Sequence, residues 1–302
     1  MPVINDAHCH FFSTPFFAAL GRGLPEAADR TPDKAALARL GWDAPGSAEE
    51  LADRWIAELD RAGVSRAAVI ASVPGDAGSV AVAAGRHPTR LVPFAMVDPT
   101  EADAISRVID VFGANTRGAF CLFPAMHRFA LHDERVRPVF EAAARRPGTA
   151  VFVHCGVLTV GVRRRLGLPS AFDIRYGNPL DLHALALAYP SVPLIIPHFG
   201  AGLLREALMV ADLCPNVLLD TSSSNSWIKY HPGLTLAAVF RQALAVVGPD
   251  RLLFGSDSSF FPRGWVRDVF VQQSAALEDV GVDADTKTKI FGGNFDRLFP
   301  AA

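Results

Sequence analysis

The chain has 302 residues, half of them hydrophobic, with a formal net charge of −2 and a pI near 6.5. This length allows two average domains or one large α/β barrel. The charge gives no electrostatic footprint for nucleic acid or an anionic membrane, so neither partner is expected. The longest stretch without Asp, Glu, Lys or Arg, 182–204, contains proline, glycine and histidine, unlike a membrane helix.

Eight short apolar runs, many of them β-branched, recur along the chain. Near-continuous apolar runs of this length are typical of parallel strands covered on both faces. The runs lie at 3–11, 66–74, 91–99, 117–124, 149–156, 192–200, 216–223 and 251–259.

Segments with helical spacing separate these runs. Ser47 and Glu50 form a capping-box pattern before a helix that ends at Gly63, and Asn178 followed by Pro179 begins another. The remaining predicted helices lie at 76–86 (a weaker pattern), 101–112, 133–146, 201–212, 234–247 and 264–280.

The alternation of strands and helices predicts a (β/α)₈ TIM barrel in a single domain over 1–302. A doubly wound open sheet is the alternative, but the first run lacks the glycine-rich turn usual in that fold. The predicted connections after strands one, five and seven are long, at 12–47, 157–177 and 224–233. Because barrel active sites are built from loops that follow the strands, these three loops are expected to form a substrate lid.

Metal-competent side chains stand at the predicted strand ends. His8 and His10 are two residues apart in the first strand and so share one face. His154 ends the fifth strand, His198 the sixth and Asp257 the eighth. Strand ends of a barrel converge on one face, and three histidines with an aspartate are standard ligands for a catalytic divalent metal, most simply zinc. Hydrogen-bonding partners that orient the histidines are expected, but no residue is singled out for that role.

The stretches DAHCH, VFVHCG, IIPHFGAG and LLFGSDSSF, with a looser match at LHDERVRPVFEAA, carry a resemblance across nearly the whole chain. The sequence resembles the amidohydrolase superfamily. It is most similar to the amidohydrolase-related (amidohydrolase 2) branch, which includes aminocarboxymuconate-semialdehyde decarboxylase-like enzymes, resorcylate-type decarboxylases and a pyrone-dicarboxylate lactonase. Members of this branch are often dimers, so the resemblance implies a possible homodimer.

The resemblance also implies roles for individual residues. His8, His10, His154 and Asp257 correspond to metal ligands, and His198 to a group beside the metal-bound water that polarises or transfers a proton. Binuclear members bridge two metals with a carbamylated lysine at the fourth strand. That strand has no lysine here, so one divalent metal ion is expected.

The preferred function is a metal-dependent hydrolase that acts on a small ester, lactone or amide. An aromatic or carboxylated compound is one option for this substrate. A divalent cation lowers the pKa of its bound water toward roughly 7. Asp257 is placed to accept the water's proton and His198 to donate to the oxyanion or leaving group. The alternative is non-oxidative decarboxylation. An inactive barrel that serves as a binding protein is a third option, but such a chain would have lost ligands, and none is lost.

Polar and aromatic residues in the predicted loops favour a pocket for a small molecule, with aromatic walls and cationic ends. Asp220 and Ser222, which follow the seventh predicted strand, belong to this group. The expected substrate contacts are His127, Arg128, Ser223, Asn225, Trp227 and Arg263. The four cysteines are dispersed without a C-x-x-C pair, and no signal peptide is evident, so a cytoplasmic location is expected.

Overall fold

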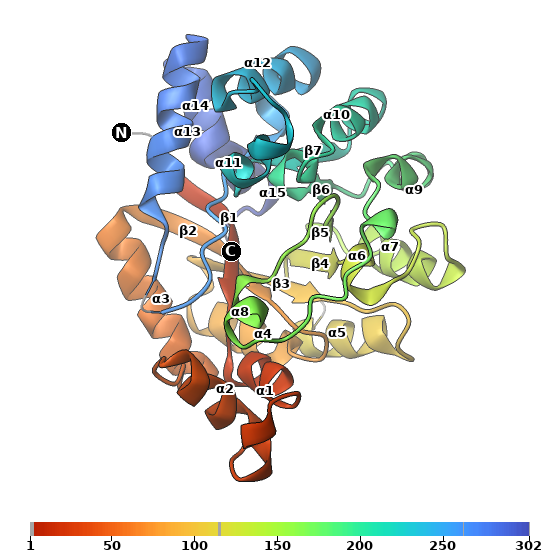
Figure 1. The fold of residues 1–302 in the computed structure, drawn as a ribbon. Helices are drawn as coiled ribbons and strands as arrows, with labels where there is room; N and C mark the ends of the chain where they lie inside the picture. Colours follow the sequence, from red (N-terminus) through yellow and green to blue (C-terminus); the bar gives the residue numbers. More distant parts are fainter. Residues whose placement is uncertain (1–2, 114–115, 262, 302) are drawn as a thin grey trace.

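The computed structural model describes residues 3–113, 116–261 and 263–301 (Figure 1). Its eight strands form one sheet in chain order, and each is parallel to the next. The strands are β1 (Ile4–Phe11), β2 (Val64–Ala71), β3 (Leu91–Met96), β4 (Gly118–Leu122), β5 (Thr149–Val153), β6 (Leu194–Ile196), β7 (Val217–Asp220) and β8 (Leu252–Leu253).

The end of the sheet returns to its beginning and closes a barrel. Although β8 is short, the chain beyond it continues beside β1. The N–H of Ala7 donates to the carbonyl of Phe254 at 2.8 Å, and the N–H of His10 donates to the carbonyl of Ser258 at 2.7 Å. The TIM-barrel prediction is therefore confirmed, and the open-sheet alternative is wrong because the two edges pair with each other.

Helices surround this barrel (Figure 1). The side chain of Ser47 caps its helix by accepting a hydrogen bond from the backbone N–H of Glu50. The Glu50 side chain in turn accepts from the backbone N–H of Ser47, which completes the capping box, and Gly63 ends the helix at φ 75°. Asn178 also caps as predicted, but the first turn after it is a 3₁₀ helix, η4 (Pro179–Leu182). The predicted helices appear as α3 (Ala48–Ala62), α4 (Ala77–Arg86), α5 (Ala104–Phe112), α7 (Arg137–Ala144), α9 (His183–Ala188), α10 (Leu204–Leu213), α12 (Leu236–Val247) and α13 (Arg267–Val280).

Several short helices were not predicted, because packing rather than local periodicity stabilises segments of this length. They are α1 (Thr14–Gly21), η1 (Pro25–Ala28), α2 (Pro32–Leu40), α6 (Pro124–His127), α8 (Gly161–Arg165), η3 (Ile174–Tyr176), η5 (Pro197–Gly200), α11 (Ser224–Trp227), η6 (Ile228–Tyr230), η7 (Pro249–Arg251), α14 (Ala284–Thr288), η8 (Lys289–Gly293) and α15 (Asn294–Leu298). The predicted helix at 133–146 begins with a 3₁₀ turn, η2 (Glu134–Val136), before α7. Within the described ranges, none of the helices has both the length and the apolar character needed to cross a membrane.

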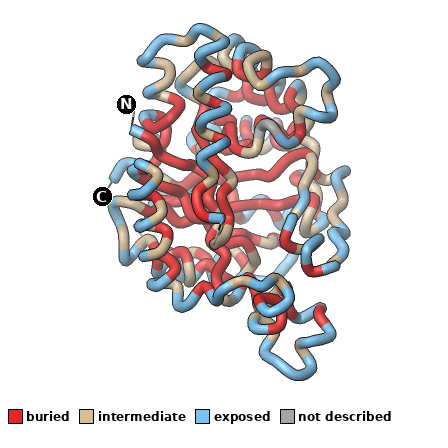
Figure 2. The backbone as a smooth tube through the Cα atoms, turned by 60° about the vertical axis from the view of Figure 1, so that its left-hand side comes forward, coloured by how far each residue is buried: buried red, intermediate tan, exposed pale blue. Residues whose placement is uncertain are grey.

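Buried apolar side chains form three clusters. The largest lies between the strands and the surrounding helices, and the second fills the barrel, which appears as the buried centre of Figure 2. Phe295 of α15 belongs to the second cluster, and its ring lies 5.2 Å from the guanidinium carbon of Arg66 near the start of β2. α15 therefore covers the amino end of the barrel. The third cluster, which we call the lid cluster, joins α1 and α2 to α8 through residues such as Phe16, Leu37 and Val162.

A bulge in β1 sets the direction of its side chains. Asp6 pairs with Ala67 and Cys9 with Val69, so three steps along β1 match two along β2. Consequently Ala7 faces the barrel interior while Cys9 packs in the outer cluster. Bulges commonly re-aim side chains beside active sites, and this one turns both histidines of β1 toward the barrel axis.

Candidate metal centre

Three donor atoms converge at the carboxyl end of the barrel. His8 Nε2 lies 3.3 Å from His10 Nε2. Asp257 Oδ1 lies 3.3 Å from His10 Nε2 and 3.7 Å from His8 Nε2. Tetrahedral ligands about 2.0–2.2 Å from a zinc ion are roughly 3.3–3.6 Å apart. The three atoms therefore fit one divalent cation.

Hydrogen bonds orient both histidines of this cluster. His8 Nδ1 lies 2.6 Å from Asp220 Oδ2, and His10 Nδ1 lies 2.8 Å from Ser72 Oγ. Since Ser72 Oγ donates to the carbonyl of Ile70, it accepts from His10. Burial alone would lower the pKa of His8, but the Asp220 carboxylate raises it. Both rings therefore present Nε2 to a cation, in the arrangement usual for metal-bound histidine.

Asp220 and Ser222 lie beneath the cavity and do not form part of its wall, contrary to the sequence analysis. Both are fully buried. Ser222 Oγ lies 3.0 Å from His8 Nδ1 and 2.9 Å from His198 Nδ1. Their position at the end of β7 could have predicted this role. The reason is that β7 ends at the same barrel face as the strands that carry the histidines.

His198 is held through the same serine. Its Nδ1 is 2.9 Å from the carbonyl oxygen of Ser222, which can only accept, so Nδ1 is the protonated nitrogen. This bond leaves Nε2 of His198 as the free nitrogen. The side chain lines the cavity described below.

His154 lies beside the compact cluster of three donors. Its ring centroid is 5.2 Å from that of His198, and it stacks on Phe123 at 5.5 Å. Its Nδ1 is buried and makes no hydrogen bond within the described part of the chain. Buried polar atoms are normally satisfied, so an orphaned imidazole nitrogen here fits a ligand for a cation. The residues present thus fit the metal expected from the sequence.

The electrostatics suit cation binding. Burial lowers the pKa of His154 well below its usual value and also lowers those of His10 and His198, so these imidazoles are neutral. Burial alone would raise the pKa of Asp257, but its hydrogen bond with His10 and the nearby histidines lower it. His10, His154 and His198 therefore offer neutral nitrogens to a cation, and Asp257 offers a carboxylate.

Four non-glycine residues that line this cavity adopt left-handed backbone conformations. The φ angles are 57° for His198, 44° for Ala201, 47° for Ser223 and 59° for Asp257. Each such non-glycine residue costs on the order of 1–3 kcal/mol and persists only where its surroundings impose it. Strain of this kind is concentrated at functional sites.

A cavity of about 510 Å³ opens above the cluster. The three long connections predicted to form a lid contribute to its walls, and the predicted contacts Ser223, Trp227 and Arg263 line it. Arg164 and Arg165 also line the cavity but were not predicted as contacts, although they belong to a run of three arginines at 163–165. The side chain of Asn225 lies outside the described residues.

The prediction that His127 and Arg128 contact substrate is not supported by their placement. Neither lines the cavity. Arg128 ends α6 at φ 57°, and its guanidinium donates to the carbonyl of Ala171 at 2.7 Å. The His127 ring instead stacks at 6.5 Å on that of Phe129. The left-handed turn at the end of α6 directs these side chains elsewhere.

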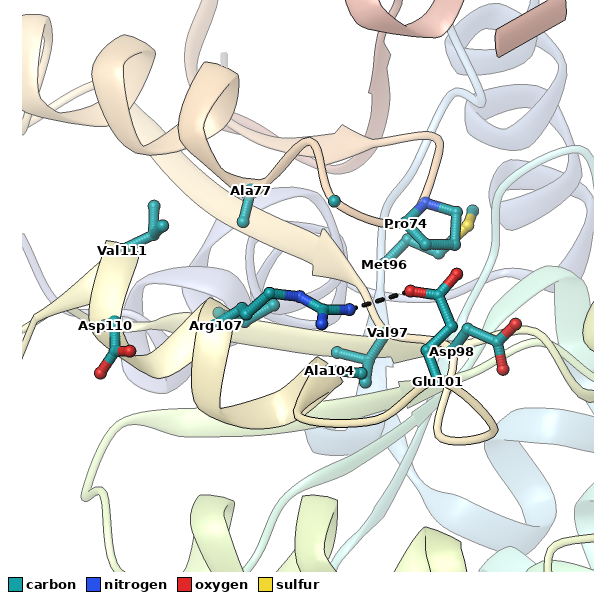
Figure 3. A pocket seen from close by; sticks show the side chains of 12 residues that line it. Pro74, Ala77, Met96, Val97, Asp98, Glu101, Ala104, Arg107, Asp110 and Val111 are labelled. Atoms are coloured by element: carbon teal, nitrogen blue, oxygen red, sulfur yellow. Dashed lines mark hydrogen bonds and ion pairs between the residues drawn. The ribbon is translucent and has the colours of Figure 1, made fainter.

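A second pocket, of about 350 Å³, lies beside α4 and α5 (Figure 3). Arg107 and Glu101 form an ion pair of 2.9 Å across it. Its described lining contains no histidine or cysteine, so it lacks the donors found in the main cavity. Met96 lines both spaces.

The family assignment follows from comparison with known sequences. The model of a family described as amidohydrolase matches residues 6–301. The chain belongs to the amidohydrolase family. A curated relative, the protein fluG of Emericella nidulans, is 28% identical over 192 residues, which cover 62% of this chain and 20% of fluG. The chain thus spans about a fifth of the length of that relative.

Solved structures share the fold of this amidohydrolase. A zinc-bound amidohydrolase from Burkholderia multivorans is 17% identical, with a TM-score of 0.62 over 99% of this chain and 100% of that one. A probable 2-pyrone-4,6-dicarboxylic acid hydrolase from Acinetobacter baumannii is 16% identical, with a TM-score of 0.61 over 98% of each chain. The manganese-bound 5-carboxyvanillate decarboxylase of Novosphingobium aromaticivorans is 15% identical, with a TM-score of 0.64 over 99% and 97%.

Family membership and the clustered donors agree. The chain is a metal-dependent enzyme of the amidohydrolase family, with His8, His10 and Asp257 grouped as its candidate metal site.

Proposed function

We propose that this enzyme hydrolyses a small ester, lactone or amide at a single divalent metal ion, with zinc as the ion. The observation that carries the proposal is the near-tetrahedral spacing of the His8, His10 and Asp257 donors, at 3.3–3.7 Å, next to the cavity. His154 is proposed as the fourth protein ligand. When bound, a divalent cation supplies Lewis acidity, which polarises a carbonyl oxygen and lowers the pKa of coordinated water toward about 7.

The protein's own groups supply proton transfer and positioning. In this proposal Asp257 accepts the proton of the attacking water, since its carboxylate borders both the donor cluster and the cavity. His198 presents its free Nε2 to the substrate and donates to the leaving group when protonated. Ser222 fixes the His198 ring, so its nitrogen is held in place before substrate arrives.

Decarboxylation of a small carboxylic acid is the second candidate. It is supported by the decarboxylase that shares this fold and by cationic side chains at the cavity. The same donors would then hold an ion that supplies Lewis acidity to the substrate oxygens, and His198 would deliver a proton to the carbon that loses carbon dioxide. The third option, an inactive barrel, has no support, because every residue of the expected ligand set is present.

Product analysis tests these proposals. Zinc-loaded and manganese-loaded protein would be incubated separately with aryl esters, lactones, anilides and hydroxylated benzoates. Acid release without carbon dioxide from the first three classes would support a hydrolase, whereas carbon dioxide from the benzoates would replace it with a decarboxylase. Asp257→Asn serves as the inactive control for contaminating esterases.

Compartment and assembly are also proposals. All four cysteines are free and buried, which supports a reducing compartment such as the cytoplasm. A homodimer rests on the resemblance alone. Sedimentation at micromolar concentration tests it, and a species near 32 kDa would contradict it.

A further inference from the structure

We infer that Gln273, on the outer helix α13, is a positioning residue for metal binding, and that it acts on His8 through the end of β7. Gln273 neither lines the cavity nor belongs to the cluster of described metal donors. The inference deepens the proposed function and rests on it, because it names a further residue on which the same metal site depends. It is carried by the hydrogen bonds of Thr221, which stands between Asp220 and Ser222.

Gln273 and Thr221 form a reciprocal pair of hydrogen bonds. The hydroxyl of Thr221 donates to Oε1 of Gln273 at 2.7 Å, and Nε2 of Gln273 donates to the carbonyl oxygen of Thr221 at 2.7 Å. Both residues are fully buried. Burying an amide is costly unless it is hydrogen-bonded, and here its oxygen and its nitrogen are both bonded to one residue. The pair therefore fixes the side chain of Thr221 and its peptide plane together.

This pair stands where β7 and β8 part. The N–H of Thr221 donates to the carbonyl of Leu253, the last residue of β8, at 2.9 Å. In a regular parallel ladder, the carbonyl of Thr221 would then accept from the N–H of Gly255. Beyond Leu253, however, the chain pairs with β1 and leaves β7. Nε2 of Gln273 takes the place of the missing strand donor, so it satisfies the carbonyl that the parting strands leave open.

The residues on either side of Thr221 both contact one nitrogen of the metal site. Oδ2 of Asp220 lies 2.6 Å from Nδ1 of His8, and Oγ of Ser222 lies 3.0 Å from the same nitrogen. Side chains alternate along a strand, so an outward Thr221 places both of these neighbours inward. Its bonded carbonyl also belongs to the peptide that leads into Ser222. A hold on Thr221 is therefore a hold on both contacts of His8.

A close backbone approach leaves these inward side chains little room. A Cβ atom at Gly255 would lie 2.7 Å from Oδ1 of Asp220 and 2.9 Å from the Cβ atoms of both His8 and Ser222. The N–H of Ser222 also donates to Oδ1 of Asp220 at 2.6 Å. Rotation of the peptide before Ser222 would press these atoms together or pull them from His8, so the bonds from α13 stabilise the arrangement that fits.

Zinc binding tests the inference without requiring turnover. Gln273→Met keeps the length of the side chain but removes both hydrogen bonds. It should weaken zinc binding by about 10-fold, the lower end of the effect of removing a direct partner of a metal-bound histidine, because Gln273 acts one residue further away. Competition with a fluorescent zinc chelator measures the affinity. Each variant is measured well below its own Tm, so that loss of folded protein does not enter the comparison.

Asn294→Leu is the matched control. The amide of Asn294 is also buried, and it donates to the carbonyls of Pro249 and Leu252 at 2.7 and 2.8 Å, beside the amino end of β8. Its loss should lower the Tm as well, but zinc affinity should stay within about 2-fold of wild type, because the site is remote from the metal donors. Equal losses of zinc affinity in Asn294→Leu and Gln273→Met would overturn the inference, since lower stability alone would then explain both.

A double-mutant cycle tests the route from Gln273 to the metal. In the Asp220→Asn background, Gln273→Met should weaken zinc binding by less than about 2-fold, because the main contact through which it acts has already been changed. Two full and independent losses would show that Gln273 does not act through Asp220, and the inference would be wrong.

Variants of Thr221 answer the same question if Gln273→Met does not fold. Thr221→Val removes the hydroxyl bond alone and should weaken zinc binding by about 3-fold, which is half the free-energy change of a 10-fold effect. Thr221→Ser keeps the hydroxyl and should bind zinc like the wild type. Wild-type affinity in Thr221→Val would contradict the inference.

These outcomes are distinguishable from failure of the proposed function. If Gln273→Met binds zinc more weakly as expected but the wild type cleaves no ester, lactone or amide, the hydrolase proposal fails and the inference stands. If the wild type is a hydrolase and Gln273→Met binds zinc as tightly as the wild type does, the inference fails and the hydrolase stands.

Discussion

Nδ1 of His8 and Oδ2 of Asp220 lie 2.6 Å apart, although 212 positions separate the two residues in sequence. Both side chains are fully buried, and the bond joins the first strand to the seventh beneath the cavity. Because this bond fixes which nitrogen of His8 faces the donor cluster, Asp220 is a positioning residue for metal binding.

Asp220→Asn should therefore weaken divalent metal binding by roughly 10- to 100-fold, the usual effect of removing the partner of a metal-bound histidine. Competition with a fluorescent zinc chelator measures the change. Asp279→Asn, an exposed change on α13, is the matched control and should bind metal like the wild type. Unchanged affinity in Asp220→Asn would show that Ser222 alone orients His8.

His154→Ala should lose most of its metal, because the proposed fourth ligand is removed. Chelation of wild-type protein held at a metal concentration 100 times the Kd should lower the Tm by about 4 °C, since such binding stabilises a protein of this length by about 2.7 kcal/mol. In His154→Ala the same treatment should shift the Tm far less. Elemental analysis that finds one metal per chain in the variant would remove His154 from the ligand set.

His198 and Asp257 should give different signatures. His198→Ala should retain its metal and its Tm while turnover falls by roughly 10²- to 10⁴-fold, the usual contribution of a positioned acid or base. Asp257→Asn should lose both activity and metal affinity, because an amide is a poorer ligand than a carboxylate. Rate and metal content measured on the same samples test this division of roles. A metal-free His198→Ala would make His198 a ligand.

Asp6 joins β1 to the turn that carries Asp257. Its carboxylate accepts from the backbone N–H groups of His8 and Ser256 and from the indole of Trp265, at 2.9, 3.0 and 2.7 Å. Asp6→Asn turns an amide N–H toward these buried donors and should cost roughly 1–3 kcal/mol of unfolding free energy. Urea denaturation of the chelated protein measures that loss apart from any metal effect. Asp268→Asn, an exposed change on α13, should cost much less.

An exposed ion pair should contribute to stability only above acid pH. Hydrogen bonds from Arg86 and His87 lower the pKa of Asp53 to about 2, below its usual value of 3.8. Because the folded-state pKa is depressed, its contribution is present above pH 3.8 and disappears as pH falls toward 2. The stability difference between wild type and Asp53→Asn, measured by urea at pH 7, 5 and 3, should shrink at the lowest pH. A difference that grows on acidification would contradict this assignment.

Local chemistry in the sequence determined much of the architecture. The apolar runs predict every strand, since buried parallel strands need no polar face. Ser47, Glu50 and Gly63 act within one helix, so their caps were readable without tertiary information. The five metal-competent side chains were also readable, because strand ends of a closed barrel share one face.

Tertiary structure decided what depends on residues far apart in the chain. The bulge that turns both β1 histidines inward exists only through pairing with β2. The Asp220 bond to His8 and the stacking of Phe12 near Phe260 each join the first strand or its end to a segment more than two hundred residues later. Loop conformation likewise turned His127 and Arg128 away from the cavity while placing Arg165 at its rim. Such outcomes depend on packing between loops, for which spacing along the sequence carries no signal.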